Sequence, residues 1–221
     1  MIFDLLKGDL EGALLSIIIV MPIVLMALTF HEFAHGYAAY KMGDPTAKYM
    51  GRLTLNPLKH LDLFGTLAML LAGIGWAKPV PVNSRYFKNA KKGMALTAIA
   101  GPLMNLFLGF IGLTLYALYV RFARDSWFYQ AVVLFFYYFG YLNCYLAVFN
   151  LLPIPPFDGS RLAFAVLPDR IYWNVMKHER TIMLITIIAI IGLSRIGFNP
   201  FGIITDFIID GVLGLYSLLL F

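Results

Sequence analysis

The sequence is poor in charged residues. Asp, Glu, Lys and Arg make up only 13% of the 221 residues, whereas hydrophobic residues make up 61%. An ordinary soluble domain is about a quarter charged and about half apolar. A soluble chain of this composition would not have enough polar surface to cover its core. The composition therefore excludes an ordinary soluble fold and predicts an integral membrane protein.

Other features are also missing. The single cysteine, Cys144, cannot form an internal disulfide or a cysteine-based zinc site. There is no basic helix or aromatic-interleaved basic stripe, so the net charge of +5 does not indicate nucleic-acid binding. Residues 1–11 contain three acidic residues and a single lysine, and so lack the basic region of a cleavable signal peptide. We therefore expect the apolar stretch that follows to be retained as a membrane span.

Long apolar runs dominate the chain. A helix needs about 20 mostly apolar residues to cross the hydrocarbon core of a bilayer. The main runs cover approximately residues 14–40, 94–120, 127–150, 182–193 and 201–221, with shorter ones at 64–74 and 162–167. This pattern predicts an all-α polytopic membrane protein with about five to six transmembrane helices, in one domain over residues 1–221.

Residues 76–83 interrupt the helical pattern. Pro79 and Pro81 disfavour helix in this stretch and alternate with valines, which predicts a short β-like loop.

Lys and Arg are divided unequally between the two sides of the expected bundle. If the end of the first run is cytosolic and the spans alternate, residues 41–92 and 158–180 together carry 13 of them and the opposite side carries four. Cytosolic loops are enriched in Lys and Arg. We therefore expect a multi-pass protein of the cell membrane with the end of the first run at the cytosolic face, provided that residues 64–74 do not cross.

The first run ends in a group of ionisable residues. His31 and His35 are four residues apart, so on a helix both imidazoles lie on one face and can reach one zinc ion. Glu32 projects beside them, and can take a proton from a zinc-bound water whose pKa is lowered to about 7. An ionisable residue inside a span costs roughly 2.5 kcal/mol or more, so three together indicate a function rather than a solvated helix end.

A catalytic zinc usually has three protein ligands and an open position for water. The candidates for the third ligand are Asp44, His60, Asp62, Asp158, Asp169, His178, Asp206 and Asp210. Asp158 is favoured on local grounds, because it follows a long apolar run and a proline-broken segment and precedes Gly159, which allows close backbone approach. An ordinary Asp-Gly turn at the membrane surface explains the same residues about equally well.

Three asparagines lie in or beside the spans. Asn105 is a polar group in an otherwise apolar run, and could donate to a substrate carbonyl or to a developing oxyanion. A hydrogen bond between helices is the simpler explanation for it, and the same argument applies to Asn143 and Asn150.

Three motifs in this order resemble the site-2 protease family of intramembrane metalloproteases. They are HEFAH at residues 31–35, GPLMN at residues 101–105 and NLLPIPPFDG at residues 150–159. The resemblance covers about residues 14–167, which would form a three-helix catalytic core, and residues 178–221 match only in general character. The chain is similar to a compact member of the family without a PDZ-like or regulatory domain.

The resemblance implies the roles of individual residues. The expected zinc ligands are His31, His35 and Asp158. Glu32 would be the general base and later the proton donor to the leaving amine. Asn105 and Asn150 would position the substrate or stabilise the transition state.

The resemblance also implies the reaction and the partners. We expect hydrolysis of peptide bonds in or near the transmembrane segments of membrane-protein substrates, with lipid around the enzyme and the active site nearer the cytosolic face. The extended loop at residues 76–83 would pair with an unwound substrate strand.

Two other functions fit a membrane protein with these residues. A metal-ion transporter would need polar residues across the whole bilayer, whereas here they gather in one layer. A scaffold that binds zinc without turnover would not need Glu32.

Overall fold

The described chain is helical. The computed structural model describes residue 14 and residues 16–72, 75–123 and 127–220, and in this part of the chain no strand is formed. The elements are η1 (Ser16–Val20), α3 (Met21–Lys41), α4 (Thr46–Tyr49), η2 (Pro57–Lys59), α5 (Leu63–Ala72), η3 (Ser84–Tyr86), α6 (Ala90–Phe122), α7 (Tyr129–Asn150), α8 (Asp158–Ala165), α9 (Asp169–Lys177), α10 (Glu179–Arg195) and α11 (Pro200–Leu220).

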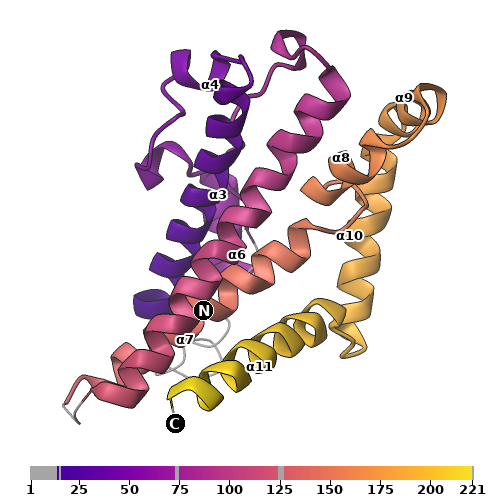
Figure 1. Ribbon diagram of the computed structural model, residues 1–221. Helices are drawn as coiled ribbons and strands as arrows, with labels where there is room; N and C mark the ends of the chain where they lie inside the picture. The colour runs from indigo at the N-terminus through magenta and orange to yellow at the C-terminus, as the bar shows by residue number, and fades with distance from the viewer. Residues whose placement is uncertain (1–13, 15, 73–74, 124–126, 221) are drawn as a thin grey trace.

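Three long helices form the centre of the molecule. Figure 1 shows α3, α6 and α7 side by side, with α11 against the end of the bundle where α7 begins and α10 at its edge. In the described residues, four stretches are long and apolar enough to cross a membrane: Ile17–Lys41, Ala90–Phe122, Tyr129–Asn150 and Pro200–Leu219. The all-α prediction is confirmed, and four candidate spans stand where five to six were expected.

The remaining apolar runs form helices that are too short to cross alone. The 17 residues of α10 extend about 26 Å at 1.5 Å per residue, less than the roughly 30 Å of hydrocarbon. The ten residues of α5 extend about 15 Å. Residues 73–74, at the end of the 64–74 run, lie outside the described residues. So do residues 1–11, which were expected to precede a retained span.

Small residues allow α6 and α7 to pack closely. A Cβ atom added at Gly112 would lie 2.6 Å from the backbone nitrogen of Gly140, and one at Gly109 would lie 2.5 Å from Cys144 Sγ. Glycines at helix contacts permit this approach in membrane bundles, where van der Waals packing replaces the hydrophobic effect between helices. The close contact fixes α7 against α6, and therefore fixes where the chain leaves α7 toward α8.

The β-like loop is an extended segment held against its surroundings. Its one β-bridge pairs Ala77 with Leu61 in antiparallel orientation. Lys78 N–H donates to the His60 carbonyl at 2.8 Å, and Asn83 N–H donates to the buried Asp44 carboxylate at 2.6 Å. The prolines explain why no strand develops, since each removes a backbone donor from the ladder.

Candidate metal centre

Two imidazoles from α3 meet inside the bundle. His31 and His35 are 6% and 8% exposed, and their rings are perpendicular with centroids 4.5 Å apart. The two Nε2 atoms lie 3.0 Å apart. The spacing of four residues produces this pairing, because one helical turn brings i and i+4 to the same face.

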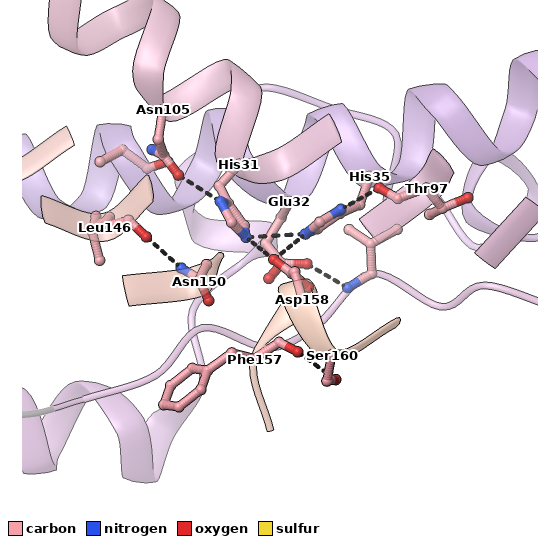
Figure 2. A network of polar contacts seen from close by, with 12 residues as sticks. His31, Glu32, His35, Thr97, Asn105, Leu146, Asn150, Phe157, Asp158 and Ser160 are labelled. Atoms are coloured by element: carbon pink, nitrogen blue, oxygen red, sulfur yellow. Dashed lines mark hydrogen bonds and ion pairs between the residues drawn. The ribbon is translucent and has the colours of Figure 1, made fainter. Parts of the chain in front are cut away.

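Asp158 reaches the same point from a distant part of the sequence. Its Oδ2 atom lies 3.0 Å from His31 Nε2 and 3.2 Å from His35 Nε2. Figure 2 shows the carboxylate directed at both rings. Asp158 is the first residue of α8, where a carboxylate also benefits from the positive end of the helix dipole.

Glycines allow both parts of the site to approach. A Cβ atom at Gly101 of α6 would lie 2.5 Å from His35 Nε2 and 2.7 Å from His31 Cε1. A Cβ atom at Gly159 would lie 2.1 Å from the Leu151 carbonyl oxygen, in the turn that leads out of α7. The two glycines therefore define how near α6 comes to the imidazoles and how near α8 comes to the end of α7.

The outer nitrogen of each imidazole is hydrogen-bonded. His31 Nδ1 lies 2.5 Å from Asn105 Oδ1, and His35 Nδ1 lies 2.8 Å from the Thr97 carbonyl oxygen. Both partners are acceptors, so each Nδ1 atom donates and each Nε2 atom carries a lone pair. Such outer contacts fix the tautomer and orientation of metal-binding histidines.

The donor set fits a divalent cation. Two nitrogen lone pairs and a carboxylate oxygen converge, and the three ligand atoms lie within 4.8 Å of one another. The buried Asp158 Oδ2 atom meets no proton donor there, so a cation is what the arrangement lacks. Two histidines, one carboxylate and an open fourth position suit a catalytic zinc.

Glu32 lies beside this set but is held by a different part of the chain. Its Oε2 atom accepts a hydrogen bond of 2.7 Å from the backbone N–H of Val80, in the extended segment. Figure 2 shows the carboxylate next to Asp158. The segment at residues 76–83 therefore contacts a residue adjacent to the candidate metal ligands.

The asparagines of the sequence analysis have separate environments. Asn105 is fully buried behind His31, and its amide nitrogen lies 2.9 Å from Asn143 Oδ1. Asn150 is half-buried, and its side chain donates to the Leu146 carbonyl of its own helix at 2.9 Å.

Among the eight candidates for a third ligand, Asp158 alone joins the histidines in the described residues. Asp44 accepts hydrogen bonds from Thr46 and Asn83, and buried His60 contacts the Thr54 carbonyl. Asp206 and Asp210 are exposed on α11. The other three candidates have partners away from the histidines: Asp62 accepts from Gly65 N–H, Asp169 pairs with Lys91, and His178 contacts the Asn174 carbonyl.

Sequence reasoning missed three contacts of this centre. The Thr97 carbonyl and the Val80 N–H are backbone groups, and no side-chain pattern reveals them. Asn143 contacts the centre only through Asn105, and the sequence indicates no more than a polar group in a span. Its spacing of seven residues from Asn150, two helical turns, placed both amides near one face of α7 and was the one available signal.

These elements define a class of protein, a membrane protein with a candidate zinc-type metal site on and beside its spanning helices. Comparison with known proteins makes the class specific. Residues 117–193 match the model of peptidase family M50. The chain is 46% identical over 158 residues to "Putative zinc metalloprotease YwhC" of Bacillus subtilis, covering 71% of this chain and 72% of that protein.

Two further relatives have the same kind of name. "Putative zinc metalloprotease MJ0611" of Methanocaldococcus jannaschii is 30% identical over 192 residues, covering 84% of this chain and 81% of that protein. "Putative zinc metalloprotease Rip2" of Mycolicibacterium smegmatis is 33% identical over 148 residues, covering 61% and 52%. No solved structure matches significantly. The chain belongs to peptidase family M50, the site-2 protease family, and is a zinc metalloprotease.

Proposed function

We propose that the protein cleaves peptide bonds in or near the transmembrane segments of membrane-protein substrates. The observation that carries this proposal is that half-buried Asp158 meets buried His31 and His35 on and beside membrane-spanning helices, with Glu32 next to them. These three residues would hold the zinc ion. A centre at this position reaches a peptide bond that lies in the bilayer, which a soluble protease does not.

Glu32 is the general base in this proposal. When bound, zinc polarises the scissile carbonyl and lowers the pKa of a water molecule. Glu32 takes the proton of that water and later gives it to the leaving amine. The Val80 N–H fixes Oε2, so the carboxylate keeps one orientation and Oε1 is available for the proton.

The substrate helix must unwind before it is cut, because its own hydrogen bonds protect its carbonyls. The extended segment at residues 76–83 would hold the unwound strand by strand addition. The N–H groups of Lys78, Val80 and Asn83 are already used within the protein, and Pro79 and Pro81 have none. The carbonyls of Lys78 and Pro79 also accept from Arg52 Nη2, at 2.6 and 3.4 Å. A substrate strand would therefore pair mainly with the backbone of residues 80–82.

The two asparagines take different roles. Asn150 is half-buried at the end of α7, beside the turn that leads to Asp158, and would position substrate or stabilise the transition state. Asn105 is fully buried behind His31 and would act on the ligand instead of the substrate.

The protein would act as one domain over residues 1–221 in the cell membrane, with lipid around its spans. The histidines lie in the second half of α3, which ends at Lys41 and leads into the Lys- and Arg-rich part of the chain. By the positive-inside rule, the active site would be nearer the cytosolic face.

The test compares the full-length protein with its variants in liposomes, on a model single-span substrate. We expect Glu32→Gln to keep zinc, because Glu32 is not a ligand, and to lose about 100-fold or more of cleavage with the general base. Asp158→Ala should lose both zinc and cleavage. Asp206→Asn is a matched control that removes a carboxylate from α11, away from the site. Cleavage by Glu32→Gln at the wild-type rate would refute the mechanism, and full zinc occupancy in Asp158→Ala would assign the third ligand elsewhere.

A further inference from the structure

Two side-chain amides lie in the apolar interior of the bundle. Asn105 of α6 and Asn143 of α7 are both fully buried. Burying an amide is unfavourable unless its donors and acceptor are hydrogen-bonded, so the bonds that these amides make determine their orientation. Asn143 contacts no metal ligand, and the proposed reaction gives it no role.

The orientation of Asn143 is set by its own helix. Its Nδ2 atom donates to the Phe139 carbonyl oxygen, one turn earlier, at 2.9 Å. A backbone carbonyl only accepts, so the amide nitrogen must face Phe139 and Oδ1 must face away from it. That Oδ1 atom lies 2.9 Å from Asn105 Nδ2.

The orientation of Asn105 then follows. Its Nδ2 atom faces two acceptors, Asn143 Oδ1 at 2.9 Å and the Ala27 carbonyl oxygen at 3.2 Å. Both protons of the amide are used, so Oδ1 faces His31 Nδ1 at 2.5 Å. The reversed amide would set oxygen against oxygen at two contacts. His31 must therefore carry its proton on Nδ1 and present the Nε2 lone pair to the metal.

We propose that Asn143 is a positioning residue of the metal centre, which acts through Asn105 to hold His31 in its metal-binding tautomer and orientation. The proposal rests on His31 being a zinc ligand. It links the three core spans by one polar chain, from the Phe139 carbonyl of α7 through Asn143 and Asn105 to His31 of α3. Each bond also polarises the next, which makes His31 Nε2 a stronger ligand.

The first experiment uses a matched pair, Asn143→Thr and Asn143→Val. The two side chains have the same shape, but the threonine hydroxyl can donate to the Phe139 carbonyl and accept from Asn105. Zinc affinity of the full-length protein in detergent is measured by competition with a chromogenic chelator. We expect Asn143→Val to bind zinc about 3- to 10-fold more weakly and Asn143→Thr to stay within about 2-fold of wild type. Equal affinities in the two variants would overturn the proposal.

Two controls separate the effect of this hydrogen-bonded chain on His31 from a general effect on packing. Thr205→Val removes a fully buried polar group away from this chain of amides, a hydroxyl that donates to the Phe201 carbonyl of its own helix. This variant should leave zinc affinity unchanged. His31→Ala should abolish tight zinc binding. Tight zinc binding by His31→Ala would overturn the metal site itself. If His31→Ala loses zinc but Asn143→Thr and Asn143→Val bind it equally well, only the positioning role of Asn143 is overturned.

A double-mutant cycle gives the second readout. Asn105→Val should weaken zinc binding by about 10- to 100-fold, and adding Asn143→Val should weaken it no further, because the influence of Asn143 passes through Asn105. Multiplying effects would show that Asn143 acts by packing alone. In the zinc-free protein, ¹⁵N NMR of labelled histidine should show the Nδ1–H tautomer of His31 in wild type and Asn143→Thr, and a mixture of tautomers in Asn143→Val.

Discussion

The candidate metal ligands of this protein come from two parts of the chain that are built differently. His31 and His35 come from one long helix, four residues apart, and are pressed against α6. Asp158 comes from the start of an eight-residue helix, after a turn that follows α7. The first pair is arranged by helical periodicity, while the third ligand depends on how two distant segments pack.

Because of this difference, substitutions near the histidines and near Asp158 should disturb the site in different ways. The histidines keep their mutual spacing as long as α3 is helical, so a change near them alters how the rings are tilted. Asp158 has no such local constraint. Its position depends on the packing of α8 against α6 and on the contact between Gly159 and the carbonyls of Leu151 and Leu152, just after α7, so a change there moves the whole ligand.

The largest effect is expected from Gly159→Ala. The added Cβ atom would lie 2.1 Å from the Leu151 carbonyl oxygen and 2.6 Å from that of Leu152. These are backbone atoms, so they cannot avoid the clash by a change of rotamer. The start of α8 must shift, and Asp158 shifts with it. Since a displacement of about 1 Å costs on the order of 100-fold in rate, we expect at least that loss of cleavage together with weaker zinc binding. Wild-type zinc affinity in this variant would show that α8 adapts and that the turn does not fix the ligand.

A smaller effect is expected from Gly101→Ala, which acts on the helical pair. Its Cβ atom would meet side-chain ring atoms, at 2.5 Å from His35 and 2.7 Å from His31, and not backbone. The rings can tilt, but only by weakening their contacts with Thr97 and Asn105. We expect zinc affinity to fall about 10-fold, the lower end for losing support of a ligand. Alanine favours helix over glycine by about 1 kcal/mol, so the melting temperature of the zinc-free protein should not fall.

The outcome for Gly101→Ala is informative in either direction. Unchanged zinc binding would mean that α6 does not restrain the rings. A loss of folding instead of metal would mean that Gly101 serves helix packing alone.

The helical pair was easier to predict from the sequence than Asp158. His31, Glu32 and His35 could be recognised because their spacing is local and ionisable residues are costly in a span. The alternatives to Asp158 could not be excluded locally, because an Asp-Gly pair after prolines also describes an ordinary turn. The family resemblance favoured Asp158, and the packing of α8 against α6 brings its carboxylate to the imidazoles.

The fold was predictable where hydropathy alone decides it. The spans that became α3, α6 and α7 are continuous apolar runs, so their existence follows from composition. Composition does not decide whether α5 and α10 cross the membrane. Both are apolar but too short to cross alone, so tertiary contacts determine how they lie. The contact between Glu32 and Val80 also depends on tertiary packing, since it joins residues 48 positions apart through a backbone group.

The smallest effect is expected from Glu179→Gln, which tests whether α10 helps the turn and α6 to hold the Asp158 segment. Arg161 of α8 lies 2.6 Å from Glu179 at the start of α10, and both side chains are about one third exposed. A partly exposed ion pair contributes about 1 kcal/mol or less. We therefore expect a small fall in melting temperature, with zinc affinity and cleavage within about 2-fold of wild type. A large loss of zinc affinity would mean that α10 anchors α8, and that the third ligand depends on the C-terminal helices as well as on α7.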